Sequence, residues 1–260
     1  MGDDSAFRAA VVPHPPLLVP DLVGTGPGTE PARRLLAACD RAVRFLLDPP
    51  PARVVVVGTG RADITHDRTA WGTLAGFGVD VRAPAGPAAA APPGEAPTLP
   101  LSLTLGSWLL DRAAWSAGRL LVEVGPGAEV GLGAAVAHGP CPWPARHRAD
   151  AWLVLGDPGP VPAGPDGQAD PLPGTELGLL RSPDPTVVLA PDPEPENAAV
   201  RQHPAPWRIL ARALREEAPR RADIRAHLLY DAAPYGVPYH VSTWLCRPQG
   251  PSVNSFTWAH

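Results

Sequence analysis

The segment RVVVVGTG, residues 53–60, constrains the fold of this chain more strongly than any other. Four consecutive valines favour extended backbone, and an apolar run without polar alternation is typical of a strand buried on both faces of a parallel sheet. The run follows a strand-like segment at 7–12 and an amphipathic stretch at 31–48, which begins with a proline in its first turn and ends before Pro49. We therefore expect a strand, a helix and a second strand joined by a right-handed parallel crossover.

The chain continues with the same alternation of strands and helices. Apolar segments that end at glycine predict buried strands at 119–125 and 151–157. Apolar residues at helical spacing predict helices at 101–115 and 206–218. Alternating strands and helices indicate an α/β fold rather than a bundle or a sandwich.

The C-terminal part predicts a different arrangement, because the stretches at 224–231 and 237–245 flank the turn sequence APYG and favour an antiparallel strand pair. The Pro- and Gly-rich segments 83–97 and 157–175 are expected to be exposed loops. The expected fold is α/β: a single domain over residues 1–260, with a central, mostly parallel sheet, helices on both faces and a C-terminal antiparallel strand pair.

Composition excludes several classes of function. The formal net charge is -4 and no basic run is present, which argues against a nucleic acid or an anionic membrane surface as partner. The chain has no lysine, which excludes a Walker-type phosphate loop and a Schiff-base mechanism. Three cysteines without a CxxC pair indicate neither a disulfide framework nor a cysteine zinc site. With no signal peptide or long apolar segment, we expect a soluble, cytoplasmic protein.

Three residues that follow predicted strands are candidates for chemistry, because ligands of open α/β sheets bind beyond the carboxyl ends of the strands. His14 follows the first strand, His66 lies in the expected loop GTGRADITHDR after the second, and Asp157 ends the strand AWLVLGD. The prolines around His14 restrict its backbone, which either aims the imidazole or merely ends the strand. Two histidines and an oxygen ligand are the facial set that holds non-haem Fe(II).

The motifs VVPHPPLLVP, PLSLTLGSWLL, WLVLGD, APWRIL and LLYDAAPYGVPYHVSTW resemble the class III extradiol ring-cleavage dioxygenase family, whose superfamily includes the Memo proteins. The matches extend from residue 11 to 244. The resemblance implies a single α/β domain and, in active members, a mononuclear Fe(II) bound by two histidines and a further ligand. It places His14 in the motif of the first iron histidine and His66 in the loop of the second.

The sequence also departs from the family pattern. Active members carry a catalytic histidine after the strand that here ends LGDPGP, where this chain has Asp157. The third ligand is expected near the start of the late helix, where His203 and Glu196 are candidates, and His240 is a further one. The resemblance thus assigns His14 and His66 to the metal and leaves Asp157 and His203 as candidate catalytic residues.

Three functions stay open. The first is an Fe(II)-dependent dioxygenase in which a small catechol-type aromatic substrate and dioxygen share the metal. The second is a catalytically degenerate relative, without a metal, that binds a small molecule or a protein partner. The third is a hydrolase or lyase that uses zinc in the same cleft. Superfamily members often associate, so a homo-oligomer is also an expectation.

Overall fold

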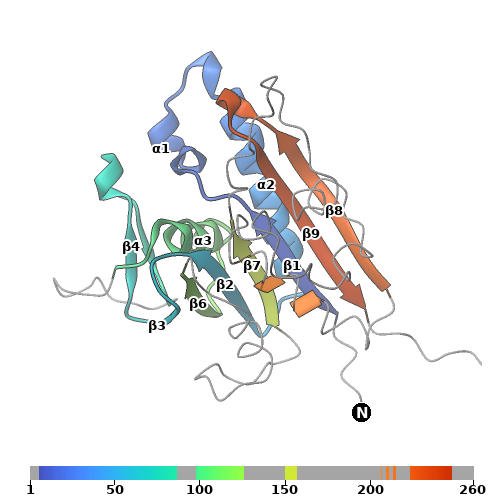
Figure 1. Ribbon diagram of the computed structural model, residues 1–260. Coiled ribbons are helices and arrows are strands. Elements are labelled where there is room, and N and C mark those ends of the chain that lie inside the picture. The colour runs from blue at the N-terminus through green and yellow to red at the C-terminus, as the bar shows by residue number, and fades with distance from the viewer. Residues whose placement is uncertain are drawn as a thin grey trace, which may run out of the picture.

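The computed structural model describes residues 6–86, 98–125, 150–156 and 223–247, together with Pro206, Ile209, Leu210, Ala213 and Leu214 of a helical segment. It contains a seven-stranded sheet in the order β3-β6-β2-β7-β1-β9-β8 (Figure 1). The strands are β1 (Phe7–Val12), β2 (Arg53–Thr59), β3 (Ile64–His66), β6 (Gly118–Val124), β7 (Asp150–Leu155), β8 (Asp223–Ala232) and β9 (Tyr239–Arg247). The predicted α/β fold is confirmed.

The centre of the sheet is parallel and its margins are antiparallel. Strands β6, β2, β7 and β1 run parallel to one another, whereas β3, β9 and β8 run antiparallel to their neighbours. The valine run of β2 lies between β6 and β7, and Val54 to Val57 are buried. An unbroken apolar strand is stable there because both of its faces are covered. The expected C-terminal strand pair is also present, as β8 and β9.

Helices cover both faces of the sheet, as predicted. Helices α2 (Glu30–Leu47) and α3 (Leu101–Arg112) pack on one face, where they bury Leu155. The helical residues around Leu210 pack on the other face, where they bury Val154. Val154 and Leu155 are consecutive residues of β7 but lie in opposite cores, because successive side chains of a strand point to opposite faces.

Helix α3 lies close against the sheet because of Gly106. A Cβ atom at this position would meet the side chains of Val56 and Leu155 at 2.6 and 2.8 Å, so a larger residue would push the helix outward. At the start of α3, the Ser102 hydroxyl donates a 2.6 Å hydrogen bond to the Thr59 carbonyl at the end of β2. The first turn of α3 is thereby fixed beside the carboxyl end of β2.

Several shorter elements are not predicted by the sequence patterns. Strands β4 (Trp71–Thr73) and β5 (Arg82–Pro84) form a separate two-stranded antiparallel sheet. The helical turns are η1 (Pro16–Leu18), α1 (Pro20–Val23), η2 (Pro27–Thr29), η3 (Ala75–Phe77) and η6 (Pro234–Gly236). His66 was expected in a loop, and this is wrong, because it is the last residue of β3. The expected loop at 157–175 lies outside the described residues.

None of the helices in the described ranges combines the length and the apolar character that crossing a membrane requires.

Candidate functional site

The four parallel strands end at one edge of the sheet, where the chain leaves in two directions. Beyond β2 the chain reaches α3 on one face, and beyond β7 it reaches the helical residues around Leu210 on the other. Ligands of open α/β sheets bind where the connections of neighbouring strands diverge in this way. The residues that follow β1, β7 and β2 at this edge are His14, Gly156, Gly60 and Arg61, which we call the carboxyl-end site.

His14 lies two residues beyond β1 in a stiff segment. Pro13 and Pro15 are buried on either side of it, the imidazole is partly exposed, and its Nδ1 atom is buried. The Gly156 amide donates a 3.1 Å hydrogen bond to the Val12 carbonyl, which keeps the end of β7 beside the end of β1. The residue that follows β7 is therefore bonded to the last residue of β1, two positions before His14.

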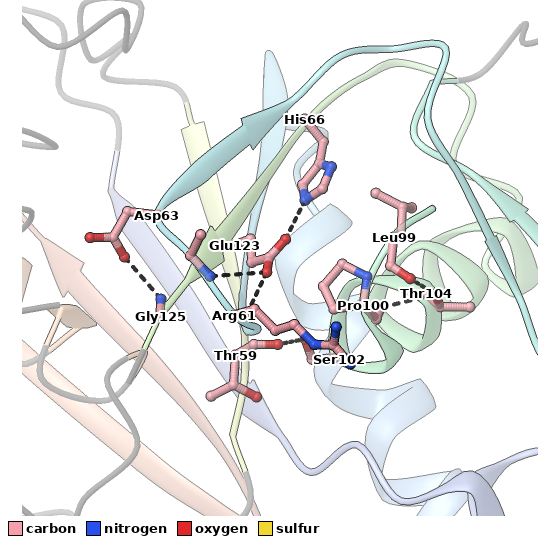
Figure 2. A network of polar contacts seen from close by, with 11 residues as sticks. Thr59, Arg61, Asp63, His66, Leu99, Pro100, Ser102, Thr104, Glu123 and Gly125 are labelled. Atoms are coloured by element: carbon pink, nitrogen blue, oxygen red, sulfur yellow. Dashed lines mark hydrogen bonds and ion pairs between the residues drawn. The ribbon is translucent and has the colours of Figure 1, made fainter. Parts of the chain in front are cut away.

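A buried carboxylate, Glu123, lies at this end of the sheet on the side away from β1 and binds several neighbouring groups (Figure 2). The Oε1 atom of Glu123, on β6, accepts hydrogen bonds from the amides of Arg61 and Ala62 at 2.6 and 3.3 Å, and its Oε2 lies 2.8 Å from Nε2 of His66. The side chains of His66 and Glu123 are only 7% and 8% exposed. The loop after β2 is thus tied to β6 through one carboxylate.

The surroundings of Glu123 keep it ionised. Burial raises the pKa of this carboxyl, but hydrogen bonds from the Arg61 amide, His66 and the Ala62 amide lower it, and the net pKa lies below the ordinary value of 4.5. The three donors therefore offset the cost of removing a charge from water. At neutral pH Glu123 is an anion held by two backbone amides and an imidazole.

Close contacts fix the rest of this loop. A Cβ atom on Gly60 would overlap the Glu123 carboxylate, so only glycine fits above it. The Gly60 amide donates to the Val124 carbonyl at 3.0 Å, and the Gly125 amide donates to Oδ1 of Asp63 at 2.9 Å. Both ends of residues 60–63 are therefore bound to β6 and to the residue that follows it.

The Arg61 side chain is exposed and has no hydrogen-bond or ion-pair partner among the described residues. In the view of Figure 2 it runs toward Ser102 and the first turn of α3. An unpaired guanidinium is a strong donor for an anionic oxygen. Arg61 is therefore the free cation of the carboxyl-end site within the described ranges.

The structure does not bring His14 and His66 together. One row of the sheet runs across β1, β7, β2, β6 and β3 through Val12, Leu155, Gly58, Glu123 and Ile64. Four strand spacings of about 4.8 Å separate the ends of this row by roughly 19 Å. His66 lies two residues further along β3, back toward the middle of β6.

Two imidazoles on one metal ion must bring their nitrogens to within about 3 Å of each other, since each metal–nitrogen bond is about 2 Å long. The separation of β1 and β3 does not fit an iron or zinc ion shared by His14 and His66. Over the part of the chain that the structure describes, no group of three or more His, Cys, Asp or Glu side chains could hold a metal ion. The described residues alone therefore do not bring His14 and His66 to one ion, and a site that includes residues outside them stays a prediction.

The other predicted site residues are distributed differently. Asp157, Glu196 and His203 lie outside the described residues. His240 lies on β9 with a 1% exposed side chain, and its Nδ1 is 2.9 Å from Oδ1 of Asp231. His240 is therefore a buried residue of the sheet with a carboxylate beside it.

Sequence reasoning overlooked Glu123 and Arg61. A signal for the first was present, because Glu123 is the one carboxylate in the apolar strand RLLVEVG, and a charge in a buried strand needs partners. No sequence signal identified its partners, which lie on a loop and on β3.

A hollow of about 850 Å³ lies at the amino end of the sheet between α2 and α3. Its lining includes Asp40, Arg44 and Arg112. The Arg112 guanidinium is paired with Asp40, with a shortest separation of 2.9 Å, and lies 5.8 Å from the Trp108 ring. This hollow is remote from the strand ends where the connections diverge, so we regard the carboxyl-end site as the better candidate.

No family model matches this chain, and no curated protein matches it. A solved structure that it resembles is the crystal structure of the uncharacterized protein JW3007 from Escherichia coli K12. The two are 12% identical, and the match covers 91% of this chain and 98% of that chain with a TM-score of 0.44. A likeness of this size carries no conclusion about the function of the present chain.

Proposed function

We propose that this protein is a catalytically degenerate relative of the class III extradiol dioxygenases that binds a small anionic aromatic molecule at the carboxyl-end site. The observation that carries the proposal is the placement of the polar groups: His14 and Arg61 flank the end of β7, whereas His66 is bound to Glu123 at the far side of the parallel strands. Within the described residues, the site keeps groups that bind a ligand, and His14 and His66 are not paired there.

The spacing of these groups suits a small ligand. The row of the sheet places Val12 and Gly58 two strand spacings apart, roughly 10 Å, with the end of β7 between them. One aromatic ring with a polar group at each side spans such a distance. The imidazole and the guanidinium both donate hydrogen bonds, which favours phenolate or carboxylate oxygens on the ligand.

The sequence adds a second argument against ring cleavage. Asp157 stands where active members of the family carry a catalytic histidine, so the acid–base group is replaced as well. Loss of that group and separation of the two candidate metal ligands both favour binding without turnover.

The test uses protocatechuate, a catechol that carries a carboxylate, as probe. The chain is reconstituted anaerobically with Fe(II), its iron content is measured, and oxygen uptake and binding of the probe are followed. We expect far less than one iron per chain, no oxygen uptake, and saturable binding that Arg61→Ala weakens about tenfold, as expected for loss of a charged hydrogen bond.

Arg44→Ala is the matched control, because Arg44 is an exposed arginine on α2 near the amino end of the sheet, and it should leave binding unchanged. Stoichiometric iron with oxygen uptake would restore the dioxygenase hypothesis, and stoichiometric zinc would favour the hydrolase or lyase. A probe that does not bind, or binds equally to the Arg61 variant, contradicts the proposed site.

A further inference from the structure

We propose that Glu123 is a positioning residue: its carboxylate latches residues 60–63 against β6 and thereby holds Arg61 at the carboxyl-end site. The part that concerns Arg61 rests on the proposed function. The latch itself is a property of the fold and is tested separately.

The first argument is the number and kind of bonds. One Glu123 carboxylate receives two consecutive backbone amides, of Arg61 and Ala62, and the Nε2 of His66. Hydrogen bonds to an ionised acceptor are about twice as strong as neutral ones. Because the amides belong to the backbone, the carboxylate fixes the direction of the loop rather than of one side chain.

The second argument is that the side chains of this loop contribute little to holding it in place. The side chains of Arg61, Ala62, Asp63 and Ile64 are all exposed, so burial of apolar surface does not fix them. The remaining restraints are the bonds of Gly60 and Asp63 at the two ends of the loop and the close approach of Gly125 to the Ala62 backbone. Glu123 is thus the central restraint on the segment that carries Arg61.

The third argument comes from His66. Its ring is 7% exposed and its Nε2 is taken by Glu123, so the imidazole anchors the far side of the carboxylate and sets its orientation. This accounts for a buried histidine on a short edge strand without a metal ion. His66 and the two amides surround the carboxylate as three donors.

The first experiment measures hydrogen exchange of the Arg61 and Ala62 amides by NMR in the intact chain. Glu123→Gln keeps the size of the side chain and removes its charge, and Glu123→Ala removes the acceptor. Relative to core amides of β2, we expect exchange at both positions to rise on the order of tenfold in the alanine variant and by less in the glutamine variant.

Asp150→Asn is the matched control, because Asp150 is a buried carboxylate of the same sheet at its opposite end. This control should leave the relative exchange of the Arg61 and Ala62 amides unchanged. If Glu123→Ala does not fold, Glu123→Gln decides. Unchanged relative exchange in the Glu123 variants, or an equal rise in the control, overturns the latch.

The second experiment measures protocatechuate binding to Glu123→Gln, Arg61→Ala and the double variant. If Glu123 acts through Arg61, the glutamine substitution weakens binding several-fold alone but adds nothing once Arg61 is absent. Additive losses overturn the positioning role. A wild-type chain that binds no probe refutes the proposed function and with it the role in binding, whereas the exchange rates still decide the latch.

Discussion

The two ends of the parallel strands each contain a buried carboxylate, and the two are used differently. At the amino end, Asp150 of β7 pairs with Arg53 of the neighbouring strand, with contacts of 3.1 and 2.5 Å between side chains that lie opposite each other in the register. At the carboxyl end, Glu123 binds two loop amides and a histidine of β3. The first pair joins two strands, and the second shapes a loop.

The two carboxylates are therefore expected to affect different properties. Asp150 should affect the stability of the fold, and Glu123 should affect the geometry of the carboxyl-end site. A charge pair between adjacent strands strengthens a contact that the sheet already makes, so its removal should affect the whole fold. A carboxylate bound to loop amides fixes the conformation of a backbone segment that the sheet itself does not fix. Its removal should therefore change mainly the loop. Three substitutions or conditions test this division.

The largest effect is expected from Asp150→Ala. It removes the partner of the Arg53 side chain, which is only 18% exposed. Breaking a buried pair in this way should lower the free energy of unfolding by about 3 kcal/mol. Urea denaturation measures the loss, and protocatechuate binding by the folded fraction should not change. A loss below about 0.5 kcal/mol, or a selective loss of binding, would contradict a purely structural role for the amino-end pair.

A smaller effect is expected from Gly60→Ala, which places a methyl group where the Glu123 carboxylate lies. Displacing that carboxylate should cost about 2 kcal/mol of unfolding free energy, as for overpacking of a tight site. Gly76→Ala is the control, because a Cβ atom on Gly76 has no neighbour within 4 Å and should change stability by less than about 0.5 kcal/mol. Equal effects of the two substitutions would show that Gly60 does not lie against a fixed carboxylate.

The smallest effect is the pH dependence contributed by Glu123. Its pKa in the folded protein lies below the ordinary 4.5, because the donated hydrogen bonds outweigh burial, so ionisation of Glu123 favours the folded state. This stabilisation is complete above pH 4.5 and is lost as the pH falls through the folded pKa. The measurement is the difference in unfolding free energy between the wild type and Glu123→Gln, which should shrink below pH 4.5. A difference that grows on acidification would reverse the sign and refute the assigned protonation state.

Much of the fold could be predicted because its signals are local. The valine run of β2, the apolar strand of β7 and the amphipathic period of α2 each indicate their own structure, and all three lie where the sequence predicts them. The short strands β3, β4 and β5 could not be predicted in this way. A strand of three residues is too short to show a periodic pattern in its sequence. Such strands form only because a neighbouring strand supplies the hydrogen bonds.

The candidate site was less predictable than the fold. The position of His14 after β1 and of Gly156 after β7 follows from the strand patterns, and their proximity follows from parallel pairing. The expected partnership of His14 with His66 depended on which strands are neighbours. The chain returns to place β7 between β2 and β1, and β3 folds back on the outer side of β6.

By itself, the sequence determined the α/β class, the buried strands and the stiff segment that carries His14, because β-branching, apolar period and proline geometry act within a few residues of chain. Only the tertiary structure decided that His66 binds Glu123, 57 residues away, and lies four strands from His14. The local sequence does not decide strand order, because different pairs of strands can form nearly equivalent hydrogen bonds. The order is decided by the packing of distant segments on both faces of the sheet. The partner of His66 was therefore fixed by the assembled sheet and by no motif around it.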